Sequence, residues 1–114
     1  MHQMKLYDDP FRRIVSGEKT IELRLNDEKR RLVREGDGIT FTNIDTGERI
    51  VTRCKALYRA DSFVQLFYIL TDKEKMGFKH HETPDEMSNQ MRLYYSNEKE
   101  QKYGVLAIEV ECVK

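Results

Sequence analysis

The chain has 114 residues, of which 39% are hydrophobic and 35% are charged, a balance typical of a single globular domain covering residues 1–114. No apolar run approaches the ~20 residues of a membrane span, and the N-terminus lacks the apolar core of a signal peptide, so we expect a cytoplasmic protein with no membrane partner. Lysine plus arginine and aspartate plus glutamate both total 20, and this neutrality disfavours proteins that grip long duplexes nonspecifically. A pocket for one nucleotide needs only a local positive patch.

The first predicted elements are a strand, a short helix and a second strand. Residues 2–7 read as the first strand, and Asp9 is placed to cap a helix that has Pro10 at its first helical position. Gly17 ends this helix, because glycine adopts positive φ freely. The segment that follows alternates with the period of two that a half-buried strand requires, with Ile21, Leu23 and Leu25 against Thr20, Glu22 and Arg24.

The stretch from Gly17 to Arg24 is the candidate ligand-binding site, through Gly17, Lys19, Glu22 and Arg24. Glu22 and Arg24 share one face of the strand, and a turn at Gly17 can bring Lys19 round to join them. We expect the three charged side chains to border a hollow. An ordinary ion pair on a solvated strand is the alternative explanation of the same pattern.

The middle of the chain combines a basic run with a hairpin. Residues 26–34 hold the densest basic patch, in which Arg30 and Arg31 are candidate phosphate contacts, although charged runs usually form solvated turns. Strands are predicted over residues 39–44 and 49–60, joined by a turn over residues 45–48. Within the longer strand, five alternate residues suit an interior face: Ile50, Thr52, Cys54, Ala56 and Tyr58.

Helical signals dominate the third quarter. Asp61 or Ser62 can cap a helix whose apolar residues repeat at helical spacing. Residues 71–74 and 83–86 both have the form of a capping box. A stripe of Met87, Met91, Tyr94 and Tyr95 favours core packing, and either tyrosine could instead stack on a base. Residues 105–113 form the last predicted strand.

These elements predict an α+β fold, a small and mostly antiparallel β-barrel with peripheral helices. We expect Cys54 and Cys112 to be buried free thiols, because the spacing suits neither a zinc site nor a cytoplasmic disulfide. The only histidine cluster, residues 80–82, reads as an exposed loop. No metal and no cofactor are expected.

The motif Gly-x-Lys-x-x-Glu-x-Arg after a short helix resembles the signature of the ASCH domain family. The resemblance extends over most of the chain, through the segment 4–16, the turn at residues 36–37, and the strands at 41–43 and 103–111. It implies a PUA-like β-barrel that binds nucleic acid, usually RNA. Recognition of a single-stranded or modified nucleotide in a Lys19, Glu22 and Arg24 cleft is therefore the favoured function.

Two alternatives stay open. Some small bacterial members of the family are similar to acetylcytidine amidohydrolase, and this resemblance implies a metal-independent hydrolase with Lys19 and Glu74 as catalytic residues. The family's third catalytic position, a threonine two residues before the motif arginine, is Glu22 here, which departs from that pattern. A protein-interaction module of the coactivator type is the second alternative, which the neutral charge permits. The sequence leaves the ligand and the oligomeric state open.

Overall fold

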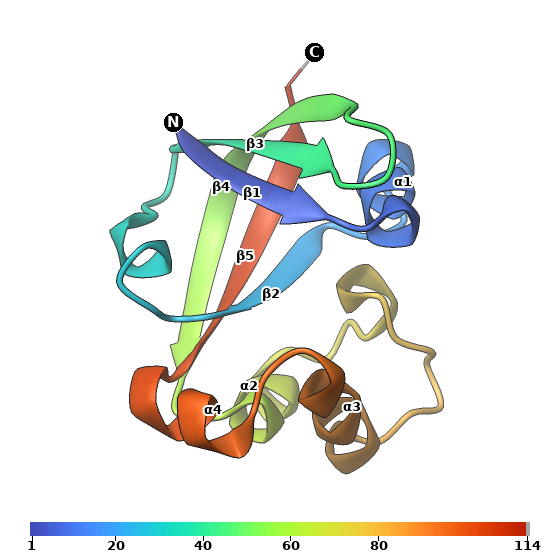
Figure 1. Cartoon of the computed structure of the whole chain (residues 1–114). Coiled ribbons are helices and arrows are strands. Elements are labelled where there is room, and N and C mark those ends of the chain that lie inside the picture. The colour runs from blue at the N-terminus through green and yellow to red at the C-terminus, as the bar shows by residue number, and fades with distance from the viewer. Residues whose placement is uncertain (114) are drawn as a thin grey trace.

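The computed structural model describes residues 1–113, and its centre is a five-stranded sheet. The strands are β1 (His2–Leu6), β2 (Ile21–Leu25), β3 (Gly38–Asn43), β4 (Arg49–Ala60) and β5 (Val105–Cys112). Their order is β1-β3-β4-β5-β2, with β1 and β3 parallel and every other pair of neighbours antiparallel. The sheet curls into a half-barrel, so the predicted α+β, mostly antiparallel barrel is confirmed (Figure 1).

Four short α-helices lie outside the sheet. They are α1 (Asp8–Ser16), α2 (Phe63–Ile69), α3 (Pro84–Gln90) and α4 (Asn97–Tyr103), and three 3₁₀ turns accompany them: η1 (Arg30–Leu32), η2 (Glu74–Met76) and η3 (Met91–Leu93). Helix α1 lies beside the ends of β1 and β3, whereas α2, α3 and α4 gather beyond the ends of β4 and β2 (Figure 1). The chain thus has a strand-rich half and a helical half.

Strand β5 joins two hydrophobic cores, because it is buried on both faces. Leu106 and Ile108 belong to the core inside the curled sheet, which α1, β1 and β3 complete. Val105 and Ala107 face the other way and pack with residues of β2, α2 and α3. All four of these β5 side chains are fully buried. Strand β5 therefore belongs to both halves of the molecule.

The alternation predicted along the whole of β4 is wrong beyond Cys54. The register with β5 shifts between Cys54 and Ala56, which leaves Lys55 as the extra residue of a β-bulge. As a result Leu57 packs against the core inside the sheet, and Tyr58 packs against the core under the helices. A bulge exchanges the two faces of a strand, and the alternation of apolar and polar residues in the sequence does not predict where a bulge occurs.

Side-chain caps confirm the predicted starts of α2 and α3. Ser62 Oγ accepts a hydrogen bond of 3.3 Å from the Gln65 N–H, so Ser62 caps α2. Thr83 and Glu86 form the reciprocal capping box of α3. Each cap satisfies backbone N–H groups that the first helical turn leaves unpaired.

Two other predicted caps are wrong. Helix α1 begins at Asp8 with Tyr7 at its N-cap, so Asp9 lies in the first turn and places its charge near the helix N-terminus instead. The capping box predicted over residues 71–74 is absent, because Glu74 belongs to the 3₁₀ turn η2. There Asp72 Oδ1 accepts from the Lys75 N–H at 3.4 Å.

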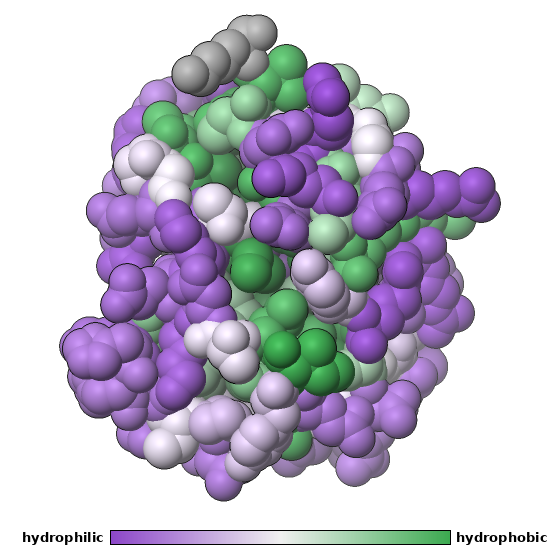
Figure 2. Space-filling model, turned by 180° about the vertical axis from the view of Figure 1, so that it is seen from behind, coloured by the Kyte–Doolittle hydropathy of each residue, from purple (hydrophilic) through white to green (hydrophobic). Residues whose placement is uncertain are grey.

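Cys54 is a free thiol, as predicted, and the two cysteines differ in burial. Cys54 is buried, and burial raises the pKa of its thiol to about 11, whereas Cys112 is half-buried. Seen from behind, the molecular surface is mostly hydrophilic, with hydrophobic residues gathered toward its middle (Figure 2). Within residues 1–113, no helix combines the length and the apolar character that crossing a bilayer requires.

Candidate functional site

A cleft of about 290 Å³ lies between the strand-rich half and the helical half of the molecule. One wall comes from the end of β1 and the start of α1, the floor comes from β2 and the residues just before it, and the other wall comes from η2, η3 and the residues that follow them. The volume is at the lower end of the ~300–1,000 Å³ range of small-molecule sites. Lys19, Glu22 and Arg24 all line this cleft, so the expected hollow beside them exists.

The three charged side chains form one connected cluster on the floor. Lys19 Nζ donates to Glu22 Oε1 at 2.8 Å, and Arg24 Nε donates to Glu22 Oε2 at 2.7 Å. The Glu22 side chain is only 6% exposed, and those of Lys19 and Arg24 are 12% exposed each. The alternative of a solvated surface ion pair is therefore wrong. Glu22 lies opposite Ile108 of β5, so it faces the inside of the curled sheet, where little of its side chain meets solvent.

Charge attraction decides the ionisation of the buried carboxyl. Burial alone disfavours the charged form of Glu22, but the nearby charges of Lys19 and Arg24 outweigh it and hold the pKa of Glu22 below its ordinary value. Burial likewise opposes the charge of Arg24, and Glu22 more than compensates, so the pKa of Arg24 is raised. The cluster therefore carries two positive charges and one negative charge.

The backbone fixes the position of Lys19. Gly17 ends α1 in the left-handed conformation at φ 85°, as the sequence predicts, and the Lys19 N–H then donates to the Arg13 carbonyl at 3.0 Å. The next residue, Thr20, donates its N–H to the Lys75 carbonyl of η2 at 3.0 Å. Lys75 Nζ in turn donates to the Gly17 carbonyl at 3.1 Å. These bonds tie the entry of β2 to the helical half, so Lys19 reaches the floor in a defined register.

The rim of the cleft is apolar and comes from both halves. Tyr7 and Ile44 stand on the strand-rich side, and Leu93 and Tyr94 stand on the helical side. All four are large hydrophobic residues that are at least half exposed, from 51% for Ile44 to 82% for Leu93. Exposed apolar side chains that converge on a hollow are typical of a binding site. The cleft thus joins a charged floor to an apolar rim.

Tyr95 also lines the cleft, but from a more enclosed position than Tyr94. Its ring stacks on Phe63 with centroids 5.9 Å apart, which anchors it to the core under the helices. Burial raises the pKa of its hydroxyl, with Arg24 and Glu22 acting in opposite directions. Of the two tyrosines predicted to be core or stacking residues, Tyr95 is the anchored one and Tyr94 is the accessible one.

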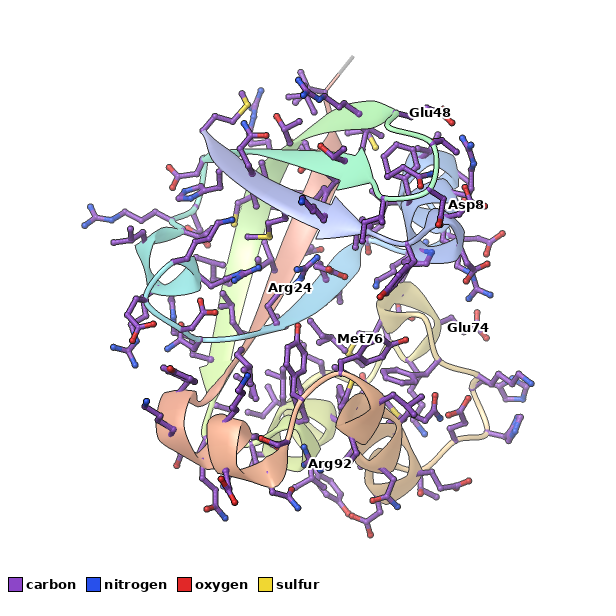
Figure 3. The ribbon with its side chains drawn as sticks, viewed as in Figure 1. Asp8, Arg24, Glu48, Glu74, Met76 and Arg92 are labelled. Carbon is purple, nitrogen blue, oxygen red and sulfur yellow. The ribbon has the colours of Figure 1, made fainter. Side chains whose placement is uncertain are left out.

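Glu74 lies outside the cleft. Its side chain is 70% exposed, and its Oε1 lies 4.0 Å from Nδ1 of His80, a residue that is itself exposed. Figure 3 shows Glu74 at the outer side of the molecule, whereas Arg24 lies at its centre and Met76 of the same 3₁₀ turn reaches the cleft. The structure thus does not bring the two predicted catalytic residues, Lys19 and Glu74, into one site.

Arg30 and Arg31 also lie outside the cleft lining. Arg30 pairs with Asp27 at 3.1 Å between Nη1 and Oδ2, and Arg31 Nε donates to the Asn26 carbonyl at 3.0 Å. Both arginines therefore fold back on the loop after β2. Gly17 shapes the turn before Lys19 and does not line the cleft itself.

Sequence reasoning missed the wall residues of the strand-rich half. Tyr7, Arg13 and Ile44 line the cleft but belong to no motif, and only the fold brings them to β2. With Lys5 and Arg13, the lining holds four cationic residues against two acidic ones, Asp9 and Glu22. In residues 1–113, no three histidine, cysteine or acidic side chains gather as metal ligands would.

A family model described as the ASCH domain matches residues 4–114 of the chain. The crystal structure of hypothetical protein PH0355 is similar over 97% of both chains, at 32% identity and a TM-score of 0.82. The solution structure of protein PF0455 from Pyrococcus furiosus is similar over 99% of this chain and 97% of that chain, at 34% identity and a TM-score of 0.70.

A more distant likeness extends the comparison of folds. The crystal structure of a ZmASCH mutant protein from Zymomonas mobilis shares 17% identity over 98% of this chain and 70% of that chain, with a TM-score of 0.62. This likeness concerns the fold alone. The curated proteins include no match to this chain.

Proposed function

Because this chain belongs to the ASCH domain family, we propose that it binds single-stranded RNA by taking one nucleotide, plain or modified, into the Lys19–Glu22–Arg24 cleft. One observation carries the proposal: a chain with no net charge concentrates four cationic side chains around a single cleft that holds two acidic ones. A local positive patch attracts a polyanion without a basic excess over the whole surface.

Each part of the cleft has a role in this proposal. The Lys19 ammonium and the Arg24 guanidinium donate hydrogen bonds to the nucleotide. Glu22 lies beneath them and holds both cations in place, which agrees with its burial better than direct contact with the ligand does. Tyr94, 63% exposed at the rim, offers a ring on which a base can stack.

The test is binding of a short single-stranded RNA to Lys19→Met, measured by fluorescence anisotropy over a range of salt concentrations. Methionine keeps an unbranched side chain beside Gly77 but removes the charge. We expect weaker binding and, if Lys19 contacts a phosphate, a slope of log affinity against log salt reduced by about 0.7. Lys55→Met is the matched control, since Lys55 is exposed on the β4 bulge away from the cleft. Equal binding by both variants would contradict the proposal.

Arg30 and Arg31 are proposed as secondary phosphate contacts for the strand as it leaves the cleft. They lie on the loop that follows β2, and Arg31 is exposed. Arg31→Ala should weaken binding of a hexamer more than binding of a dinucleotide, because only the longer strand extends beyond the cleft. An equal effect on both lengths would remove Arg31 from the binding surface.

The hydrolase alternative has one observation in its favour, the position of Lys19 in the cleft. Glu74 gives it no support, because its exposed side chain points away from that cleft. Turnover of acetylcytidine, followed by release of cytidine, tests this alternative. Turnover that is lost in Lys19→Met and kept in Glu74→Gln would establish a hydrolase without Glu74. Purification with a bound protein in place of nucleic acid would favour the interaction module.

A further inference from the structure

The acceptor atoms of Glu22 are already occupied by protein donors. Oε1 accepts from Lys19 Nζ at 2.8 Å, and Oε2 accepts from Arg24 Nε at 2.7 Å. Arg24 Nη2 also lies 2.6 Å from Oε2 as an ion-pair contact. A carboxylate has about four lone-pair positions, of which these two hydrogen bonds fill one on each oxygen, and the Arg24 guanidinium lies against Oε2. With 6% of its side chain exposed, Glu22 has little room to accept a bond from a ligand.

Lys19 and Arg24, in contrast, keep free donors. An ammonium carries three N–H bonds, and Lys19 directs one of them to Glu22. Arg24 uses Nε and Nη2 for Glu22 and for the Lys5 carbonyl at 2.6 Å. Within residues 1–113, its Nη1 bonds to no protein acceptor and is not sealed from solvent. The floor of the cleft therefore presents hydrogen-bond donors on either side of Glu22, both of whose carboxylate oxygens already accept hydrogen bonds from the protein.

The apolar rim decides what kind of acceptor reaches this floor. A phosphate is strongly hydrated and gains nothing from Tyr7, Ile44, Leu93 and Tyr94 around it. A nucleobase has apolar faces for the rim and a polar edge for the floor. The arrangement of rim and floor thus fits the edge of a base better than it fits a phosphate.

We infer that, within the proposed RNA-binding function, the floor selects a base edge with two adjacent acceptors, such as O6 and N7 of guanine, and disfavours the adenine edge. Lysine and arginine bind O6 and N7 of guanine as a donor pair, whereas adenine places an amine beside N7. That amine would face Lys19 or Arg24 donor to donor, and the carboxylate between them, Glu22, is engaged by both. The selectivity follows from the hydrogen bonds inside the cluster.

Two RNA hexamers that differ in one functional group test this inference. The first is an adenosine hexamer, and the second has inosine at one central position, which replaces the exocyclic amine by a carbonyl oxygen and leaves the phosphates unchanged. We expect the inosine hexamer to bind about tenfold more tightly. Lys19→Met should reduce this ratio, and Lys55→Met should leave it as it is.

The outcomes separate the inference from the function on which it rests. Equal binding of the two hexamers, or tighter binding of the adenosine hexamer, together with a loss of affinity in Lys19→Met, overturns the selectivity and keeps the RNA-binding cleft. If neither hexamer binds at low salt, both the selectivity and the RNA-binding function are overturned.

Discussion

Arg24 Nη2 of β2 donates a hydrogen bond of 2.6 Å to the main-chain carbonyl of Lys5 in β1. These two strands are the edges of the sheet, at opposite ends of the order β1-β3-β4-β5-β2. The curl of the sheet brings the edges toward each other, and one guanidinium bridges them. Because Arg24 also binds Glu22, the same side chain closes the half-barrel and forms the floor of the cleft. Structure and ligand binding therefore depend on one residue.

Replacing Arg24 should weaken the fold as well as the site. Arg24→Met leaves the Glu22 charge with one partner and leaves the Lys5 carbonyl without its donor, so we expect a loss of about 3 kcal/mol in the free energy of unfolding. Urea denaturation measures it. Arg53→Met is the control, because Arg53 is exposed on β4 and should change stability by less than about 0.5 kcal/mol. Similar stability of the two variants would mean that the bridge contributes little.

The pH dependence of stability should show the charge of Glu22. Its pKa is lower in the folded chain than the ordinary 4.5, so ionisation of Glu22 stabilises the fold fully above about pH 4.5, and this contribution is lost as the pH falls through the folded pKa. Glu22→Gln lacks this ionisation and leaves two cations uncompensated at neutral pH. We expect the variant to be about 3 kcal/mol less stable at pH 7.

Below pH 4.5 the difference between wild type and Glu22→Gln should shrink, because the wild-type carboxyl then becomes protonated too. Urea midpoints measured from pH 7 to pH 3 check this convergence. The lowered pKa values of Asp37, Glu48 and Glu86 act equally in both proteins and cancel in the difference. A constant gap across the whole range would show that Glu22 is not the titrating group.

Local sequence patterns predicted features within single helices and strands, but they did not predict contacts between segments that are distant in the sequence. The helix end at Gly17 and the strand that carries Glu22 and Arg24 follow from glycine and from a period of two. The burial of Glu22 does not, since Glu22 faces the inside of a sheet whose curl brings the edge strands β1 and β2 toward each other. Tyr7 reaches the cleft for the same non-local reason. The β4 bulge at Lys55 escaped notice because alternation on its two sides looks continuous.

Glu100 should be a structural carboxylate rather than a functional one. It is 3% exposed, and its Oε1 accepts from the Phe63 N–H at 2.5 Å at the start of α2, while its Oε2 pairs with Arg92. Glu100→Gln keeps the shape but weakens both bonds, so we expect a loss of about 2 kcal/mol in thermal or urea unfolding and unchanged RNA affinity. Glu98→Gln, on the exposed face of the same helix, should have little effect. Equal losses would refute a special role for Glu100.

Gly104 should tolerate alanine less well than Gly47, although both have positive φ. Gly104 has φ 74° and ψ −173°, a region that essentially only glycine adopts, and a Cβ there would lie 3.0 Å from the Ala60 carbonyl oxygen. Gly47, at φ 78°, has open space around it. We expect Gly47→Ala to cost about 1 kcal/mol and Gly104→Ala about 3 kcal/mol in unfolding free energy. Equal costs would mean that the contact with Ala60 relaxes freely.

Tyr94 offers the most direct test of base stacking at the rim. Its side chain is 63% exposed and lines the cleft, whereas Tyr68 on α2 is 68% exposed and lies outside the cleft lining. The two tyrosines therefore have similar exposure but different positions. Tyr94→Ala should weaken RNA binding by about 1–3 kcal/mol, the usual contribution of one stacked base, with no change in stability. Tyr68→Ala should change neither quantity. If both variants bind RNA as tightly as wild type, the base does not stack on Tyr94, and Tyr7 becomes the ring to replace next.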